Sequence, residues 1–342
     1  MKMPLSSSVL AYALLATGCG PPPAAQTTPA QAAQPAGRTT GTESHEVCRG
    51  GLGPECVSIA RLHTNKLTAE EEKRALELWS AACEAGDEMG CAGASALLLT
   101  GSYVPHDPTR GVALSERACA AGQDVGCMTL ANALIRGSGG KKDLGRAGTL
   151  LEKVCAGGTE LACYNLGNVL LLSHGDVARV VTLFDKACRA EVLQACENLG
   201  QVYVEGLATP PSPARVSELF KSTCDKGSPV GCHNLGLQHY EGKLTPKDDA
   251  RAYALFDKNC RASFADSCST QAMMHLQGDG VPRDDVKVAE LLTRACDLGD
   301  RIACSFLGSL HDSGSGVKRD PARAKEIWAR ACKLGDTKSC KR

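Results

Sequence analysis

The chain has 342 residues, with 38 basic and 38 acidic side chains, 19 cysteines and only 4% aromatic residues. A net charge of zero argues against a nucleic-acid binder, because such a protein needs a basic surface to displace the counterions of the phosphate backbone. The low aromatic content argues against the core of a β-sandwich or barrel. The cysteine content indicates an oxidising compartment or metal binding.

The first residues predict export from the cytoplasm. Lys2 precedes an apolar run from Leu5 to Ala16, and small residues then lead to Cys19. This arrangement is typical of a secretory signal, whereas a membrane-spanning helix needs about 20 apolar residues. The segment resembles a bacterial lipobox, although Ala16 stands where Leu is commoner. That resemblance implies a lipoprotein signal peptide over residues 1–18 and lipidation of Cys19. The alternative is an ordinary signal with an incidental cysteine.

Residues 19–47 contain the lipidation site and a segment without apolar periodicity. Three consecutive prolines, Pro21 to Pro23, are followed by a mixture of Ala, Gln, Thr, Pro and Gly. Such a composition predicts a disordered tether. We therefore expect a folded domain over residues 48–342, anchored through lipid at the outer membrane or the periplasmic face of a bacterial envelope.

Without Cys19, the remaining cysteines form nine pairs, and the two members of every pair are eight residues apart. The pairs are Cys48–Cys56, Cys83–Cys91, Cys119–Cys127, Cys155–Cys163, Cys188–Cys196, Cys224–Cys232, Cys260–Cys268, Cys296–Cys304 and Cys332–Cys340. Their first members recur every 36 residues, with one interval of 35 and one of 33. A fixed period of this length indicates a solenoid of repeated helical units.

Each period contains two helical patterns. Before each pair, apolar residues at i, i+4, i+7 and i+8 mark one face of a helix, as in residues 248–260. An aspartate at the start of this helix is predicted to be its N-cap, and a glycine after the first cysteine its left-handed end. The aspartates are Asp107, Asp143, Asp176, Asp248, Asp284 and Asp320, and the glycines are Gly86, Gly122, Gly158, Gly227, Gly299 and Gly335. The second helix should begin near the second cysteine and end at Gly101, Gly137, Gly206, Gly242, Gly278 or Gly314.

Each cysteine pair therefore brackets a short turn between two antiparallel helices. A disulfide across such a turn contributes roughly 2–2.5 kcal/mol in the chain-entropy model. Zinc is the alternative, but zinc motifs typically use the spacing Cys-x-x-Cys, which does not occur in the sequence. The sequence therefore predicts a disulfide within every pair, and neither a metal site nor a cofactor.

The second helix carries the motif Leu-Gly-x-x-aromatic, as from Leu199 to Tyr203. A 36-residue helix pair with this motif resembles the Sel-1-like repeat, a relative of the tetratricopeptide repeat. The paired cysteines narrow the resemblance to cysteine-rich secreted Sel-1-like proteins. It covers residues 48–342 and implies an all-α, right-handed α-solenoid of about eight αα-hairpins, whose concave face is lined by the second helices. A shortened loop at Ser173 to Asp176 and the capping pair Cys48–Cys56 depart from the pattern.

Cysteine-rich members of this family have been described as β-lactamases or penicillin binders, so the resemblance implies activity on β-lactams or peptidoglycan fragments as an alternative function. The motif Ser-x-x-Lys occurs at Ser138 with Lys141 and at Ser315 with Lys318. A serine β-lactamase needs this motif at a helix N-terminus, together with Ser-Asp-Asn and Lys-Thr-Gly elements that the sequence lacks. We therefore treat both as weak candidates and favour polar, glycine-rich turns.

Aromatic and imidazole side chains recur at the same positions of different repeats. His239, His275 and His311 are spaced by 36 residues. A zinc ion needs its ligands around one point, whereas stacked helices lie about 9–10 Å apart, so we predict that these histidines fill positions at the edge of the core. Trp79 and Trp328 lie on the apolar helix face and are predicted to pack there.

The second helices also carry a row of carboxamides at the second and fifth positions after the cysteine. They are Asn132, Asn165, Asn168, Asn198, Gln201 and Asn234. Carboxamides donate and accept hydrogen bonds, so a row of them on an outward, concave face could bind the backbone of an extended peptide. We therefore predict an envelope-anchored scaffold for protein or peptide partners. A solvated face without a ligand remains the alternative.

Overall fold

The computed structural model describes residues 68–342 except residues 210–211, and these residues contain fifteen α-helices and no strand. The predicted signal peptide, Cys19, the tether and the Cys48–Cys56 pair lie outside the described residues. The chain divides into an N-terminal unit, described from residue 68 to 198, and a C-terminal unit of residues 199–342. The boundary between the two units falls within α11 (Leu193–Val204).

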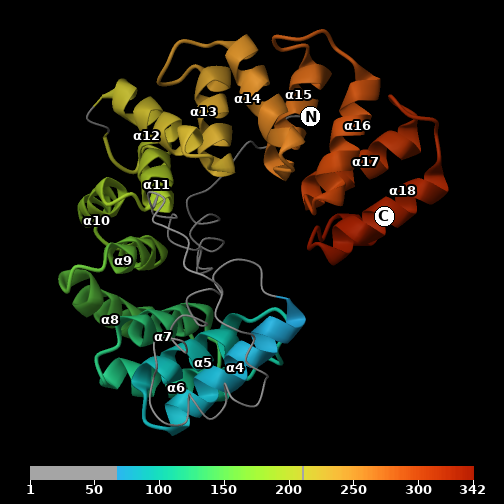
Figure 1. Ribbon diagram of the computed structural model, residues 1–342. Coiled ribbons are helices and arrows are strands. Elements are labelled where there is room, and N and C mark those ends of the chain that lie inside the picture. Colours follow the sequence, from blue (N-terminus) through green and yellow to red (C-terminus); the bar gives the residue numbers. More distant parts are fainter. Residues whose placement is uncertain (1–67, 210–211) are drawn as a thin grey trace, which may run out of the picture. The chain divides into compact units, whose positions relative to one another are not determined.

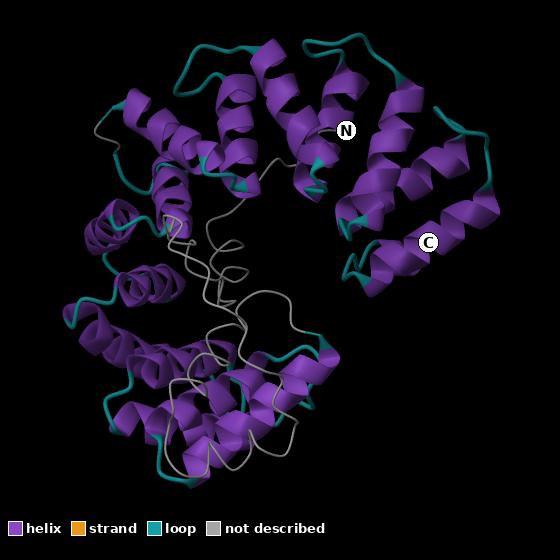
Figure 2. Ribbon diagram, viewed as in Figure 1, coloured by secondary structure: helices purple, strands orange, loops and turns teal. Residues whose placement is uncertain are grey.

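Both units are built from helical hairpins (Figures 1 and 2). The N-terminal unit contains α4 (Ala69–Glu84), α5 (Glu88–Thr100), α6 (Pro108–Ala120), α7 (Asp124–Arg136), α8 (Leu144–Ala156), α9 (Glu160–Leu172) and α10 (Val177–Arg189). The C-terminal unit contains α12 (Pro213–Asp225), α13 (Pro229–Glu241), α14 (Asp249–Arg261), α15 (Ala265–Gln277), α16 (Asp285–Asp297), α17 (Arg301–Ser313), α18 (Pro321–Lys333) and a 3₁₀-helix (Ser339–Lys341). Each even-numbered helix forms a hairpin with the odd-numbered helix that follows it. The predicted all-α solenoid is therefore confirmed.

The six aspartates predicted as N-caps all begin even-numbered helices, and the carboxylate of each accepts a backbone hydrogen bond from the first turn. At Asp248, for example, the Oδ1 atom accepts from the N–H of Arg251 at 3.0 Å. The N–H of Asp248 itself donates to the carbonyl of His239 in the preceding odd-numbered helix at 2.8 Å. Asp248 thus caps the start of α14 and also links this helix to the preceding odd-numbered helix, α13.

The glycines predicted to end the even-numbered helices have φ angles of 83° to 99°. Glu191 and Ser263 take the same left-handed conformation in two other repeats, with φ angles of 66° and 67°. The predicted helix end at Gly101 is confirmed, because Gly101 is the C-cap of α5, and its φ is −59°. Gly101 is needed for space, because a Cβ atom there would lie 2.2 Å from Oε1 of Glu72.

Eight cysteine pairs, from Cys83–Cys91 to Cys332–Cys340, form the predicted disulfides, with Cα atoms 4.3–4.8 Å apart. Each odd-numbered helix begins three residues before the second cysteine of its pair rather than at it. The disulfide therefore joins the last turn of one helix to the first turn of the next. The last bond joins α18 to the 3₁₀-helix. Disulfide pairing is thus confirmed for all the pairs that the structure describes.

The core between an odd-numbered helix and the next even-numbered helix matches small residues to large ones. Glycine occupies the fourth position after the second cysteine wherever the next helix contributes an aromatic ring to the core. A Cβ atom at Gly167, Gly200, Gly236 or Gly308 would lie 2.5–2.6 Å from Phe184, Phe220, Phe256 or Trp328, respectively. Where the large residue is Leu151 or Leu292, the equivalent small residue is Ala131 or Ala272. Trp328 therefore packs as predicted, and Trp79 packs against Gly93.

A double-mutant cycle at Gly236 and Phe256 tests this size matching. In Gly236→Ala the higher helix propensity of alanine stabilises the protein by up to about 1 kcal/mol. The added methyl group, however, overpacks the ring of Phe256, which destabilises the protein by roughly 1–3 kcal/mol. Phe256→Leu leaves a cavity that the added methyl group of Gly236→Ala would fill. We therefore expect the free energy of unfolding of the double variant to exceed the additive value by about 1–2 kcal/mol. Urea unfolding of the four proteins measures this coupling.

Pairing Gly236→Ala with Phe184→Leu provides the matched control. Phe184 occupies the equivalent position in α10 and is also fully buried, but it packs against Gly167 rather than Gly236. Distant sites without shared partners are additive within about 0.5 kcal/mol. Additivity in both pairs would contradict the proposed match between glycine and ring.

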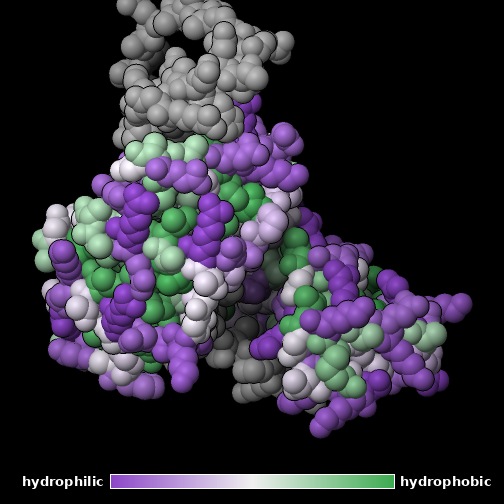
Figure 3. All heavy atoms as spheres, turned by 90° about the horizontal axis from the view of Figure 1, so that it is seen from below, coloured by the Kyte–Doolittle hydropathy of each residue, from purple (hydrophilic) through white to green (hydrophobic). Residues whose placement is uncertain are grey.

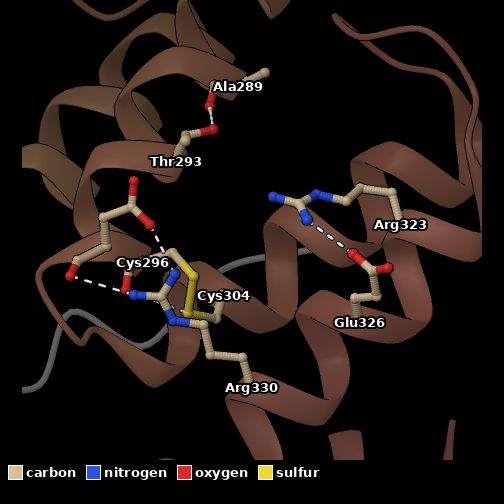
Figure 4. A network of polar contacts seen from close by, with 8 residues as sticks. Ala289, Thr293, Cys296, Cys304, Arg323, Glu326 and Arg330 are labelled. Atoms are coloured by element: carbon tan, nitrogen blue, oxygen red, sulfur yellow. Dashed lines mark hydrogen bonds and ion pairs between the residues drawn. A yellow bond between two sulfur atoms is a disulfide. The ribbon is translucent and has the colours of Figure 1, made fainter.

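Cationic side chains join successive even-numbered helices. Figure 4 shows Arg330 of α18 beside the Cys296–Cys304 disulfide. Its guanidinium pairs with the carboxylate of Asp297 at 2.7 Å and donates to the main-chain oxygen of Asp297, the last residue of α16, at 3.3 Å. Arg294 donates in the same way to the carbonyl of Arg261 at 3.0 Å. A cation at a helix C-terminus stabilises carbonyl groups that lack intrahelical partners.

On the face drawn in Figure 3, hydrophilic residues surround smaller groups of hydrophobic ones. Among the described residues, no helix has the length and apolar character needed to cross a membrane.

Candidate functional site

The carboxamides predicted from the sequence all lie on odd-numbered helices. Asn132 is on α7, Asn165 and Asn168 are on α9, Asn198 and Gln201 are on α11, and Asn234 is on α13. We call the surface formed by these helices within each unit the odd-helix face. In the N-terminal unit it brings two of the predicted residues together, because Nδ2 of Asn198 donates to Oδ1 of Asn168 at 2.9 Å.

The exposure of these side chains differs from the sequence expectation. Asn165, Asn168, Asn198, Gln201 and Asn234 are only 2–9% exposed, and Asn132 is half-buried. The expected outward orientation is therefore wrong for five of the six side chains. Their positions turn toward neighbouring elements of the solenoid, as the bond between Asn168 and Asn198 shows, and amides meet other protein groups there rather than water.

Several of these amides nevertheless retain unused hydrogen-bonding atoms. Oδ1 of Asn132, Nδ2 of Asn168 and Oδ1 of Asn234 are buried without a hydrogen-bond partner. An unsatisfied buried polar atom costs about 1–3 kcal/mol, and folded proteins keep few of them. Rotation of an amide exchanges its oxygen and nitrogen, so each side chain can offer a donor or an acceptor. These atoms are enclosed by the protein, so a ligand would reach them only if the amide side chains turned outward.

Tyr164 lies beside two of these amides in the N-terminal unit. Its side chain is 1% exposed, and its ring centroid lies 5.8 Å from that of Phe184. Burial raises the pKa of the phenol to about 12, while the amides of Asn168 and Asn198 act in the opposite direction. Tyr164 is therefore neutral at physiological pH and contributes a polar hydroxyl, not a charge, to this part of the core.

Between α5 and α7, which are in contact, the odd-helix face opens into a notch. Its lining consists of Ala96, Leu99 and Thr100 from α5, Thr129, Asn132, Ala133 and Arg136 from α7, and Ser138 from the following turn. The fifth position after the second cysteine is an amide in both α7 and α9, but it is Ala96 in α5. We call this depression the α5–α7 notch.

The two Ser-x-x-Lys motifs lie in turns rather than at helix N-termini. Ser138 follows the end of α7 and Ser315 follows the end of α17. The hydroxyl of Ser315 lies 3.4 Å from Oδ2 of Asp285, and within the described residues no hydrogen bond joins either serine to Lys141 or Lys318. The C-terminus of a helix carries partial negative charge, which opposes ionisation of a hydroxyl. These contacts do not activate either serine as a nucleophile.

The C-terminal unit contains a Ser–His–Asn group that the sequence interpretation missed. Nδ1 of His233 lies 3.0 Å from Oγ of Ser267, and Nδ2 of Asn259 donates to the same oxygen at 2.9 Å. All three side chains are at most 4% exposed, and burial lowers the pKa of His233 to about 4. Because a substrate cannot reach this serine, we assign the group to the polar core that joins α13, α14 and α15.

The three histidines spaced by 36 residues make separate local contacts. Nε2 of His275 lies 3.2 Å from the hydroxyl of Tyr253, and the two rings meet edge to face with centroids 5.6 Å apart. The carbonyls of His239 and His311 accept hydrogen bonds from N-cap residues of the next helices. Across the described part of the chain, no cluster of three or more His, Cys, Asp or Glu side chains has the geometry to hold a metal ion.

Comparison with solved structures shows the same fold. The chain is similar to a Sel1 repeat protein from Oxalobacter formigenes, with a TM-score of 0.63 and 20% identity over 88% of this chain and 89% of that chain. It is also similar to c5321, a protective antigen of uropathogenic Escherichia coli strains with an SLR fold, with a TM-score of 0.58 and 18% identity over 88% of this chain and 66% of that one. At these identities the similarity concerns the fold alone. No curated protein matches the chain.

The family comparison agrees with the repeat period and the disulfide-closed hairpins. The profile of the Sel1 repeat matches residues 69–87, 89–123, 161–189, 193–228, 229–263, 272–300 and 301–336. These ranges cover more than half of the sequence and follow the helical hairpins of both units. The chain therefore belongs to the Sel1 repeat family.

Proposed function

We propose that this protein is a non-catalytic scaffold that binds protein or peptide partners in an extended conformation through its odd-helix face. The observation that supports the proposal is the solenoid of Sel1 repeats, in which each repeat adds one odd-numbered helix, and solenoids of this kind offer extended binding surfaces. An extended peptide offers one N–H donor and one carbonyl acceptor in nearly every residue. Such a ligand would bind amides that turn outward from one unit through its backbone, largely independently of its side chains.

The proposed cellular location is the bacterial envelope, with a lipid on Cys19 and residues 19–47 as the tether. The eight disulfides support an oxidising compartment outside the cytoplasm. Two or more acyl chains on one cysteine would give a stable anchor, whereas a single chain binds a membrane only marginally. The scaffold would then present its odd-helix face to soluble partners close to the membrane.

The double variant Asn168→Ala with Asn198→Ala tests the binding function. It removes both members of a buried hydrogen bond, so neither partner is left unsatisfied by the loss of the other. We expect the amount of each partner captured from envelope extracts to fall about tenfold, which corresponds to about 1.4 kcal/mol. Immobilised wild-type and variant proteins are compared by quantitative mass spectrometry, and thermal unfolding verifies that both are folded.

The matched control is Gln123→Ala with Gln194→Ala, which removes two amides outside the predicted row. Gln123 directly precedes α7, and Gln194 is the second residue of α11. Capture by this control should equal that of the wild type. If the Asn168 and Asn198 variant captures the same partners in the same amounts as the wild type, the odd-helix face is not the binding surface.

A further inference from the structure

We propose that this protein associates with a second copy of itself, head to tail, through the first three disulfide-closed turns that the structure describes. These turns are residues 83–91, 119–127 and 155–163, and we call their surface the aliphatic edge. It would bind residues 332–342 of another copy, which are the last closed turn and the two residues after it. We call this segment the basic end. The predicted carboxamides lie further along the odd-numbered helices, so the association is separate from peptide binding.

Each turn of the aliphatic edge exposes one aliphatic side chain at the same position, two residues before the second cysteine. Met89, Val125 and Leu161 are 37%, 42% and 38% exposed, respectively. The fold does not require an apolar residue at this position, because later repeats have Gln194 and Asp266 there. Single exposed aliphatic residues are common, but a row in successive repeats marks a surface that a partner can cover. Burial of these side chains would then favour association.

The second and third turns of the edge are joined directly. The hydroxyl of Thr159, the N-cap of α9, donates to Oδ2 of Asp124, the first residue of α7, at 2.8 Å. Val125 follows Asp124, and Leu161 lies two residues after Thr159. This bond therefore brings the helix starts that carry the two aliphatic side chains together.

The first turn adjoins the second. Glu88, the first residue of α5, pairs with Arg117, which lies just before the second turn, at 2.8 Å. Among the described residues nothing covers the three turns, because a Cβ atom at Gly86, Gly122 or Gly158 would have no neighbour within 4 Å. The described fold therefore leaves the edge open to another surface.

The aliphatic edge is negatively charged. Its three turns contain no lysine, arginine or histidine, and their five acidic residues are Glu84, Asp87, Glu88, Asp124 and Glu160. Arg117 pairs with only one of them, Glu88, so a net negative charge remains. Two such edges repel each other, which opposes a symmetric contact between identical surfaces and favours a basic partner surface.

The basic end carries the complementary features. Leu334 is 40% exposed, and Lys333 and Lys338 beside it are exposed as well. Residues 332–342 contain four basic side chains and one acidic side chain. The guanidinium of Arg342 lies over the ring of Trp328, 4.9 Å from its centroid, and holds the segment against α18. The end therefore presents an aliphatic side chain surrounded by cations on an ordered surface.

The two surfaces together specify a head-to-tail contact, with aliphatic side chains at its centre and opposite charges around them. Because one copy presents both surfaces, each added copy leaves one edge and one end free, so association continues into chains or rings. The surfaces are small. We therefore expect a weak association, with a dissociation constant on the order of tens of micromolar.

Sedimentation velocity of the mature, oxidised chain, produced without lipid, tests the association. The weight-average mass should rise with concentration beyond that of a dimer. High salt should weaken the association about tenfold, because it screens the opposite charges. A mass that stays at that of one chain at every concentration would overturn the proposal.

Charge variants test the head-to-tail pairing. Glu84→Lys with Glu160→Lys disables the edge, and Lys333→Glu with Lys338→Glu disables the end. Each protein alone should remain monomeric. An equimolar mixture should form dimers but nothing larger, because the intact end of one variant binds the intact edge of the other. A mixture that stays monomeric, or single variants that still assemble into chains, would contradict this pairing.

The matched charge control is Glu77→Lys with Glu152→Lys, which makes the same change of charge at exposed residues outside the edge. This control should associate as the wild type does. If it loses association to the same extent as the edge variant, net charge and not the edge governs assembly, and the proposal fails.

Serine substitutions test the aliphatic side chains and remain informative if a charge variant folds poorly. The triple variant of the row is Met89→Ser, Val125→Ser and Leu161→Ser, and its dissociation constant should rise at least about tenfold. The matched triple variant is Tyr103→Ser, Leu207→Ser and Val286→Ser, which alters apolar side chains that are 47–58% exposed outside the edge. The matched variant should associate as the wild type does. Equal association of the row variant and the wild type would exclude the edge as the contact.

Discussion

Reduction of the disulfides is expected to abolish the cooperative unfolding transition of this protein. Each bond closes an eight-residue separation across a helical turn, which contributes about 2.5 kcal/mol in the chain-entropy model. The sum over eight bonds is an upper bound, but it exceeds the 5–15 kcal/mol net stability of ordinary domains. We therefore expect the reduced and alkylated chain to show a broad thermal transition by circular dichroism, in contrast to a sharp transition for the oxidised protein.

Removal of a single disulfide should lower the free energy of unfolding by a fraction of what reduction of all the disulfides removes. Cys224→Ala with Cys232→Ala eliminates one disulfide without leaving a free thiol and should lower the free energy of unfolding of the C-terminal unit by about 2 kcal/mol. The matched control is reduction and alkylation of this double variant, which should reach the same end state as the reduced wild type. A reduced wild-type chain that still melts sharply would contradict a stabilising role for the bonds. Peptide mapping that links different pairs would contradict the pairing itself.

The features predicted correctly from the sequence are those fixed within one hairpin. An aspartate such as Asp248 caps the helix that follows it, and a cysteine pair such as Cys260–Cys268 closes the turn between its own two helices. Both depend on contacts between residues less than about a dozen positions apart. The repeat period therefore determines them without knowledge of the neighbouring repeats.

Burial of the carboxamides could not be predicted in the same way. The 36-residue period places Asn168 and Asn198 at related repeat positions, but it does not give the rotation of each helix about its axis. That rotation follows from packing against neighbouring elements, where the amides of α9 and α11 meet. The steric need for glycine at Gly101 could not be predicted for a related reason, because Glu72 belongs to a different helix and fills the space beside it.

The Ser–His–Asn group also depends on contacts between repeats, because His233 and Ser267 are 34 residues apart. One signal was nevertheless present in the sequence. Asn259 precedes the first cysteine of its pair, a position at which most other repeats have alanine. A polar residue at a position that is otherwise small and apolar indicates that a buried partner must be nearby.

Covalent closure of each hairpin also bears on the proposed binding. A ligand that binds a surface already held in its bound shape loses less free energy to ordering of the receptor. The disulfides fix the start of every odd-numbered helix described here, and the carboxamides of the odd-helix face lie on those helices. Affinity for a peptide should therefore depend on the oxidised state, even where the amides themselves are unchanged.

The C-terminal unit should lose stability in mild acid through His233. Burial lowers the pKa of this histidine in the folded protein to about 4, from 6.5. The folded protein therefore favours the neutral ring. The contribution of His233 to the free energy of unfolding is complete above pH 6.5 and declines as the pH falls toward 4. The reason is that this histidine binds a proton in the unfolded chain at a higher pH than in the folded protein. Between pH 7 and pH 4.5 we expect the free energy of unfolding to fall by about 2–3 kcal/mol through this group.

His233→Phe should remove this part of the pH dependence. The ring lies between Phe256 and Phe264, at centroid distances of 5.4 and 5.6 Å, so another aromatic ring suits the site. Ser267 keeps its hydrogen bond from Asn259 in the variant. Urea unfolding at pH 7 and pH 4.5 compares the wild type with His233→Phe. The control is His106→Phe, which alters an exposed histidine. In this control the free energy of unfolding should depend on pH as it does in the wild type. An equal loss of stability in the wild type and in His233→Phe would show that other groups cause the acid sensitivity.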